Sequence, residues 1–135
     1  MTAPAGLEGL RVFVVEDDML IAIHIEEALQ NLGCVVVGPV AKLDAALRMA
    51  DSEDLDAAIL DVNIRGGPVF PVAERLRARG IPFALASGYG DWALPEAFRN
   101  QPRLTKPFTE QELGAQVLSL HRRQGVVERA GTSPA

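Results

Sequence analysis

The sequence predicts an α/β protein in which helices cover both faces of a parallel β-sheet. Two observations predict this fold class. Short apolar runs rich in β-branched residues alternate along the chain with longer segments whose apolar residues recur at helical spacing, and glycine or proline separates most of them. The length of 135 residues is enough for one domain with its own core.

The first strand and helix are expected near the N-terminal end. Leu10–Val15 is an apolar run short enough for a buried strand. Met19–Leu32 follows as the first helix, with apolar residues at helical spacings: Leu20, Ile23, Ala28, Leu29 and Leu32. Gly33 suits the end of this helix.

The middle of the chain continues the alternation. Cys34–Val37 is predicted as the second strand, ended by Gly38–Pro39, and Ala41–Ala50 as the second helix. Ala57–Asp61 is predicted as the third strand. Pro68–Arg79 is predicted as the third helix, because the amide that a proline lacks in a first turn has no helical partner.

The next segment breaks the pattern. Ile81–Ala86 is predicted as the fourth strand and Arg103–Thr105 as a brief fifth one. Between them, the glycines and prolines of Gly88–Pro102 leave no room for a long amphipathic helix. We expect a loop there with at most a short helix near Pro95–Arg99. Five strands of this spacing favour the flavodoxin-like order 2-1-3-4-5, with a shortened or irregular fourth helix.

The last helix is predicted at Thr109–Arg123, where Thr109 and Glu112 form a capping box. Residues 1–9 are expected to be a flexible leader and residues 10–123 the domain. Residues 124–135 lose apolar content and are expected to be a flexible tail, with no output domain after it.

Composition narrows the class of protein. The formal net charge of −5 argues against a nucleic-acid-binding protein, which needs a basic face. The single cysteine, Cys34, predicts no disulfide framework and suits a reducing compartment. No apolar run approaches the length of a bilayer span, and the leader does not resemble a signal peptide. A cytoplasmic protein without a membrane partner is expected.

Polar residues follow the strands where a sheet of this order binds ligands, at the strands' carboxyl ends. Glu16 and Asp17 follow the first strand, Asp61 ends the third, Ser87 follows the fourth and Lys106 the fifth. Clustered carboxylates suit Mg²⁺, and a carboxylate beside Mg²⁺ can attack a phosphoryl group. The lysine and the hydroxyl would orient and neutralise the transferring oxygens. The set predicts phosphoryl transfer to Asp61.

These residues resemble the motifs of response-regulator receiver domains over about residues 10–123. The resemblance implies a phosphoacceptor, Asp61, that is phosphorylated by a sensor histidine kinase and is not a turnover enzyme. It also implies that Glu16, Asp17, Asp61 and the backbone carbonyl of Asn63 hold Mg²⁺, with Ser87 and Lys106 as catalytic groups. Pro107 after Lys106 predicts a rigid turn that aims the ammonium, for which a cis peptide is one option.

The sequence departs from the usual family pattern. Arg103 stands where the family usually has the aromatic residue that turns inward on activation. Leu85–Gly90 resembles the Phe-Ala-Thr-Gly-Tyr signature of an atypical, mostly single-domain subfamily, often called FATGUY. That subfamily tends to be partnered by kinases of the HWE/HisKA2 kind. Because no output domain is expected, we also expect signalling by phosphorylation-dependent docking. A monomer or a weak dimer is expected.

Alternatives remain for the function and for one acid. The chain could be a pseudo-receiver that binds partners without phosphorylation, although the complete residue set argues against it. An aspartate-nucleophile phosphohydrolase would want a second acid two residues after Asp61, where Asn63 stands. Asp18 is either part of the acidic motif or simply the N-cap of the first helix.

Overall fold

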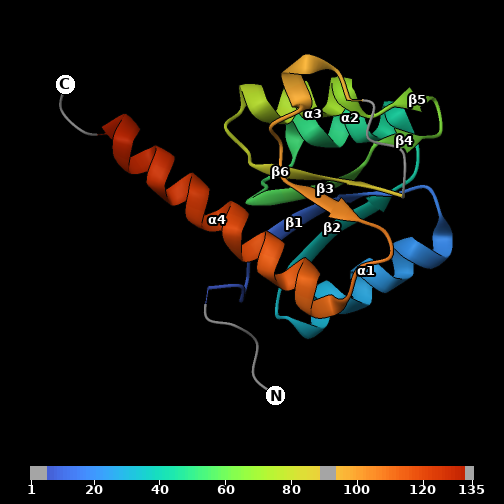
Figure 1. Ribbon diagram of the computed structural model, residues 1–135, viewed down its shortest axis with the longest axis horizontal. Coiled ribbons are helices and arrows are strands. Elements are labelled where there is room, and N and C mark those ends of the chain that lie inside the picture. The colour runs from blue at the N-terminus through green and yellow to red at the C-terminus, as the bar shows by residue number, and fades with distance from the viewer. Residues whose placement is uncertain (1–5, 89–93, 133–135) are drawn as a thin grey trace.

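A computed structural model describes residues 6–88 and 94–132, with side chains described as far as Arg122. Five parallel strands form one sheet in the order β2-β1-β3-β6-β7, which confirms the predicted 2-1-3-4-5 order (Figure 1). Two very short strands, β4 and β5, form a separate hairpin. The strands are β1 (Arg11–Val15), β2 (Val35–Val40), β3 (Ala57–Asp61), β4 (Asn63–Ile64), β5 (Gly67–Pro68), β6 (Phe83–Ser87) and β7 (Arg103–Thr105).

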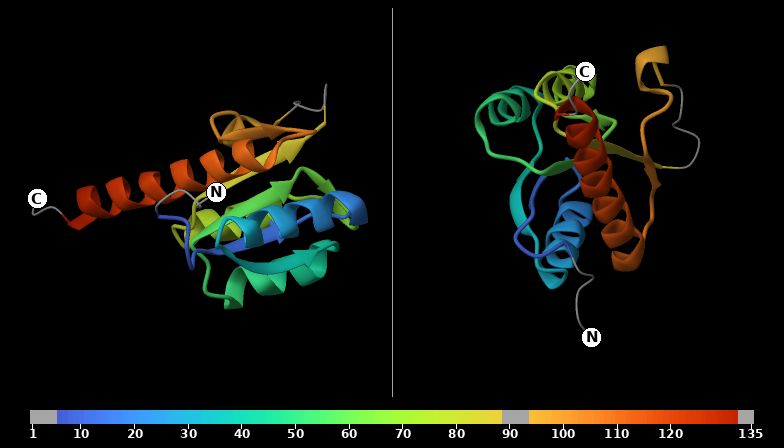
Figure 2. Two further views of the ribbon diagram at one scale, coloured as in Figure 1. Left: turned by 90° about the horizontal axis from the view of Figure 1, so that it is seen from below. Right: turned by 90° about the vertical axis from the view of Figure 1, so that its left-hand side faces the viewer.

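Helices cover the two faces of the sheet in pairs. The helices are α1 (Met19–Asn31), α2 (Leu43–Ser52), α3 (Phe70–Ala78) and α4 (Glu110–Thr132). Helices α2 and α3 lie on one side of the sheet, and α1 and α4 lie on the other (Figures 1 and 2). Alternate residues of each strand therefore enter different cores. In β3, Ala58 and Leu60 pack under α2 and α3, whereas Ala57 and Ile59 pack under α1 and α4.

The second strand continues through the residues that were expected to end it. Gly38 and Pro39 lie inside β2, joined by a cis peptide. Because β2 is an edge strand, a proline costs it no ladder bond on its open side. Gly38 has φ +101°, and a Cβ there would come within 2.8 Å of Val14 O. The pairing with β1 shifts register near this point, so only glycine fits the bulge.

The buried face of α1 contains only part of the predicted apolar set: Ala28, Leu29 and Leu32 are buried, and Leu20 and Ile23 are not. Ile25 and Leu29 are 1% and 0% exposed, whereas Leu20 and Ile23 are 80% and 45% exposed, as is the neighbouring Met19 at 75%. Helical spacing alone shows that an apolar stripe exists, but α1 carries apolar residues on two faces. The sheet covers one of these faces, and the other remains on the surface.

The boundaries of α2 and α3 also differ from the prediction. Helix α2 begins at Leu43, two residues after the expected start. Helix α3 begins at Phe70, and Pro71 takes the early proline position. Pro68, expected in the first turn, instead pairs with Asn63 in the β4–β5 hairpin. Two positive-φ glycines precede Pro68, and this turn delays the start of the helix.

The link between β6 and β7 contains a 3₁₀ turn, η1 (Glu96–Phe98), in place of a long helix. This agrees with the short helix expected near Pro95–Arg99. We call residues 94–101 the cover segment, since its Leu94 and Phe98 are 5% and 2% exposed and complete the core under α3. Residues 89–93 of the predicted loop lie outside the described residues.

Described residues outside both expected bounds of the domain take part in its structure. Leu7 is 0% exposed and packs in the α1–α4 core, and Gly9 N donates to Gly33 O. Helix α4 starts with the predicted capping box, in which Thr109 and Glu112 exchange two hydrogen bonds of 3.0 Å. It continues past Arg123 to Thr132 and projects beyond the sheet (Figures 1 and 2). Few of these last residues break a helix, so falling apolar content alone does not end it.

Among the described residues, no helix combines the length and the apolar character needed to cross a bilayer.

Candidate functional site

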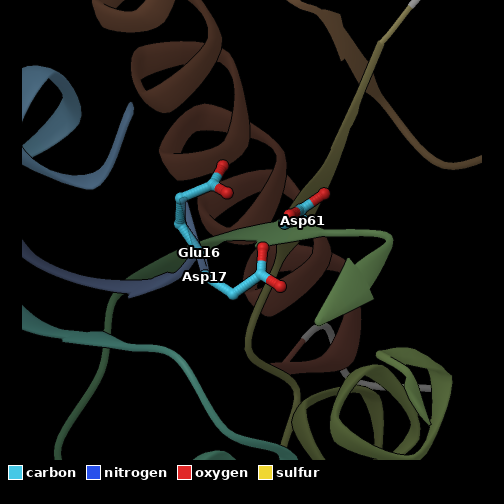
Figure 3. Close-up of side chains that lie close together, drawn as sticks. All are labelled: Glu16, Asp17 and Asp61. Atoms are coloured by element: carbon cyan, nitrogen blue, oxygen red, sulfur yellow. The ribbon is translucent and has the colours of Figure 1, made fainter. Parts of the chain in front are cut away.

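Three carboxylates meet at the carboxyl ends of β1 and β3. Glu16 and Asp17 follow β1, and Asp61 is the last residue of β3 (Figure 3). One oxygen from each of the three lies within 4.8 Å of the others. Because β1 and β3 are paired neighbours, their ends deliver these side chains to one place. The structure therefore brings together the three acids that the sequence singles out.

Lys106 reaches this cluster from the end of β7. Its Nζ lies 2.6 Å from Glu16 Oε1 and 3.3 Å from Asp61 Oδ1. The Glu16 side chain is 1% exposed and that of Lys106 15%. Glu16 Oε1 is fully buried and accepts no well-aligned hydrogen bond, so the ammonium ion is its compensation. One cation thus faces two buried acids and leaves excess negative charge at the site.

The protonation of the site reflects this imbalance. Burial, a hydrogen bond with Glu16 and charge repulsion from Glu16 together raise the pKa of Asp61 to about 7, against the opposing effect of Lys106. For Lys106, burial lowers the pKa, but Glu16 and Asp61 together outweigh burial and raise it above its ordinary value. Lys106 is therefore an ammonium at neutral pH, and Asp61 responds strongly to any further cation placed beside it.

Ser87 and Asn63 complete the set in different ways. Ser87 ends β6 and is 3% exposed, and its carbonyl accepts a 2.9 Å hydrogen bond from Lys106 N. This bond ties the ends of β6 and β7 together beside the acids. Asn63 lies in β4 and is exposed. Its position two residues after Asp61 keeps its backbone near the site.

Asp18 has a structural role of its own. It is the N-cap of α1, and its Oδ1 accepts hydrogen bonds from Leu20 N at 3.0 Å and Ile21 N at 3.2 Å. Its own amide donates to Glu16 Oε2 at 3.1 Å. The N-cap interpretation of Asp18 is confirmed, and through this amide Asp18 also helps to hold Glu16 in place.

Arg103 does not enter the core in the way that an inward aromatic would. It is exposed at the start of β7, and its Nη2 donates a 3.0 Å hydrogen bond to Arg99 O at the end of η1. A long, charged side chain keeps its guanidinium at the surface. The position therefore connects β7 to the cover segment.

Sequence reasoning missed a groove beside the acidic cluster. It has a volume of about 420 Å³ and is mostly apolar, and it is lined by Leu20, Ile21, His24, Lys106, Pro107 and Phe108. Three residues of α1 form one wall, and the turn after β7 forms the other. The Lys106–Pro107 peptide in that turn is cis. Helical spacing groups Leu20 with residues of the buried face, so the sequence gives no sign that Leu20 is exposed beside a groove.

The donor set fits a hard divalent cation. Carboxylate oxygens are the ligands that Mg²⁺ prefers, and Mg²⁺ usually takes one or two carboxylates and keeps several waters. Here three carboxylates converge, and a single ammonium balances them only in part. A bound cation would oppose the burial and the repulsion from Glu16 that raise the pKa of Asp61. The same edge can therefore hold a metal and present Asp61 as an oxygen nucleophile.

Comparisons with known proteins agree with this geometry. The family model described as the response regulator receiver domain matches residues 12–118. The transcriptional regulatory protein TcrA of Mycobacterium tuberculosis is 32% identical over 136 residues, covering 96% of this chain and 52% of that protein. The chain thus spans about half the length of this curated relative.

Two solved structures are similar over most of the chain. SdrG from Sphingomonas melonis Fr1 is 42% identical with a TM-score of 0.75, over 84% of this chain and 97% of that one. The receiver domain of the sensor histidine kinase PA1611 from Pseudomonas aeruginosa PAO1 was solved with a magnesium ion in its active-site cleft. It shares the fold at 23% identity and a TM-score of 0.72, over 84% of this chain and 98% of that one.

Proposed function

This chain belongs to the response regulator receiver domain family, and we propose that it accepts a phosphoryl group from a histidine kinase on Asp61. The observation that carries the proposal is the contact of Lys106 with both Glu16 and Asp61 at an edge where three carboxylates meet. Receiver domains act as signalling phosphoacceptors, and this edge contains the nucleophile and the charges that such a reaction requires.

In the proposed reaction, a carboxylate oxygen of Asp61 attacks the phosphorus of a kinase phosphohistidine. The phosphorus–nitrogen bond breaks, the histidine nitrogen keeps the electron pair, and an acyl phosphate forms on Asp61. The Lys106 ammonium, now 3.3 Å from Asp61 Oδ1, would neutralise a phosphoryl oxygen. The Ser87 hydroxyl would donate to another. Hydrolysis of the acyl phosphate resets the protein.

Mg²⁺ would supply charge neutralisation for the phosphoryl oxygens when it is bound. Glu16, Asp17, Asp61 and the backbone carbonyl of Asn63 are the proposed ligands. The convergence of the three carboxylates supports the first three. The place of Asn63 two residues after the end of β3 supports the fourth.

The exposed apolar face of α1 supports a protein phosphodonor over a small molecule. Leu20 lines the groove that leads to Lys106, and Met19 and Ile23 are exposed nearby on the same helix. Apolar side chains gathered at the entrance of a reactive site favour contact with a protein surface. Such a partner would bury these side chains while its phosphohistidine reaches Asp61.

The proposed subfamily and kinase type rest on the positions where the sequence departs from the usual receiver-domain motifs. We place the chain in the FATGUY subfamily because of Leu85–Gly90, and we therefore expect an HWE/HisKA2 kinase in the cytoplasm as its partner. Arg103 lies at the surface and contacts Arg99 O. Without an inward aromatic at this position, the signal would pass through the link after Ser87 to a docking partner.

The test is incubation with acetyl phosphate and Mg²⁺, followed by intact mass measurement. One added phosphoryl group is expected in the wild type and in Asp18→Asn, the control that changes a neighbouring acid outside the cluster. No addition is expected in Asp61→Asn or in excess chelator. A wild type that stays unmodified with acetyl phosphate and with phosphorylated kinase domains would instead support a pseudo-receiver.

A further inference from the structure

His24 connects helix α1 to the turn that carries Lys106. It lies in α1 on the wall of the groove, and its Nε2 is 3.4 Å from Phe108 O. The two rings are also close, with centroids 6.5 Å apart and a tilt of 44°. A carbonyl oxygen only accepts hydrogen bonds, so the contact requires the tautomer or the protonated form in which Nε2 carries hydrogen.

The turn held by His24 is short and leads directly to the reacting groups. On one side, Phe108 is 7% exposed and packs in the α1–α4 core. On the other side, Lys106 N donates to Ser87 O at 2.9 Å. Lys106 Nζ then extends to Glu16 and Asp61. A shift of the Phe108 carbonyl would therefore move the start of the lysine side chain relative to its two acids.

We propose that His24 is a positioning residue for Lys106: by donating to Phe108 O, it holds the Lys106–Phe108 turn so that the ammonium reaches Asp61. The proposal rests on the proposed function of Asp61 as phosphoacceptor. His24 touches neither Asp61 nor a proposed metal ligand, so its effect on phosphorylation would pass entirely through Lys106. A displacement of about 1 Å in a charge-stabilising group is enough to slow a reaction substantially.

Three substitutions of His24 separate the effect of its hydrogen bond from the effect of its ring contact. His24→Gln keeps an amide donor near Phe108 O, His24→Phe keeps a ring against Phe108 without a donor, and His24→Ala removes both. The position is exposed, so all three should fold with unchanged thermal midpoints. With acetyl phosphate as the phosphodonor, we expect His24→Ala and His24→Phe to slow acyl phosphate formation about fivefold. His24→Gln should stay near the wild-type rate. A normal rate in both Ala and Phe would overturn the proposal.

A double-mutant cycle with Lys106 tests the route of the effect. If His24 acts through the ammonium, His24→Ala should slow the wild type but cause no further loss in a Lys106→Ala background. The Mg²⁺ concentration for half-maximal rate should also stay the same, because the acids are not moved. An equal loss of rate in both backgrounds would show a general structural role and overturn the proposal. A higher Mg²⁺ concentration for half-maximal rate in His24→Ala would do the same.

A readout without phosphorylation keeps the two proposals separate. The Lys106 ammonium, held by two carboxylates, should give a slowly exchanging ¹⁵N–¹H signal in the wild type and in His24→Gln. That signal should broaden or shift in His24→Ala and His24→Phe, and its persistence there would contradict the positioning role. If wild-type Asp61 is never phosphorylated, the proposed function fails, and this spectrum still decides whether His24 positions Lys106.

Discussion

The acidic edge of the sheet and the cover segment are held in place by different kinds of contact. At the acidic edge, Glu16 and Asp61 are buried beside one ammonium. In the cover segment, the buried groups are apolar, and Phe98 stacks on Phe70 with ring centroids 5.0 Å apart and lies 6.4 Å from Phe83. The first arrangement concentrates uncompensated charge, whereas the second removes apolar surface from water.

Arginine replaces helical hydrogen bonds in the cover segment. The Arg77 guanidinium lies 4.6 Å from the Phe98 ring centroid, and its Nη2 donates to Ala97 O at 3.0 Å. Arg99 Nε donates to Leu94 O, and Arg103 donates to Arg99 O. Exposed cations thus satisfy carbonyls that a regular helix would satisfy internally. The comparison indicates that the charges of the acidic edge lower the stability of the fold, whereas the apolar contacts of the cover segment raise it.

The largest expected effect is a loss of stability when the apolar contacts of the cover segment are removed. Phe98→Ala should lower the free energy of unfolding by about 4 kcal/mol, because it empties a site shared by three aromatic rings. Urea denaturation at pH 7 measures this change, with Phe98→Leu as the milder control. The rate of Asp61 phosphorylation by acetyl phosphate should remain that of the wild type. A large loss of rate in a folded Phe98→Ala would show that the two regions are coupled.

Removing the Lys106 ammonium tests how charge affects stability at the acidic edge. Lys106→Met should lower the free energy of unfolding by about 3 kcal/mol in the absence of Mg²⁺, since Glu16 and Asp61 would remain buried without a cation. The double variant Glu16→Gln, Lys106→Met should recover most of this loss, as measured by the same denaturation. Equal stability of the single and double variants would contradict the excess negative charge assigned to this edge.

The pH dependence of stability gives a third measurement. Asp61 has an ordinary pKa of 3.8, which its burial and Glu16 raise to about 7 in the folded protein. Between these two pH values, Asp61 keeps its proton in the folded state and has lost it in the unfolded state. The free energy of unfolding should therefore fall as the pH rises from about 4 to about 7. Lys106 does not contribute in this range, because its raised pKa lies above 10.5 and its stabilisation is lost only at higher pH.

Two comparisons sharpen the pH measurement. The fall assigned to Asp61 should be absent from Asp61→Asn, and saturating Mg²⁺ should flatten it, because a cation binds the carboxylate and not the acid. The measurement is a series of urea denaturations in chelator and in Mg²⁺. Identical pH profiles for the wild type and Asp61→Asn would contradict the raised pKa.

The smallest expected effect concerns the arginine contacts. Arg77→Ala should cost about 1 kcal/mol of stability, since it removes cation–π contacts with Phe98 and Phe83 and one hydrogen bond at an exposed position. Arg77→Lys should recover only part of this, because lysine lacks the planar guanidinium that covers the ring. Proteolysis near residues 94–101 provides a second measurement, and faster cleavage is expected in Arg77→Ala.

Much of the fold and of the site could be predicted from local patterns. A short apolar run ending in an acid, as in Ala57–Asp61, identifies both a buried strand and the position of its functional side chain. The strand order then places Glu16, Asp17 and Asp61 together, because parallel strands end at the same edge. The capping box of Thr109 and Glu112 is equally local and appears as predicted.

Other features depend on which surfaces meet. Leu20 and Ile23 have the spacing of core residues, yet the sheet covers the opposite side of α1. Pro39 has the local character of a strand end, but β2 continues through it because the open side of an edge strand needs no amide there. Phe98 gave no pattern at all, and its burial results from contacts with α3 and β6.

The sequence by itself determined the order of the elements, the residues at the strand ends and the identity of the candidate phosphoacceptor, since these follow from composition within short windows. The tertiary structure decided which face of α1 is exposed, that Lys106 contacts both Glu16 and Asp61, and that His24 reaches Phe108 O. The physical reason is distance along the chain. Contacts between residues far apart in sequence depend on packing, which local spacing does not encode.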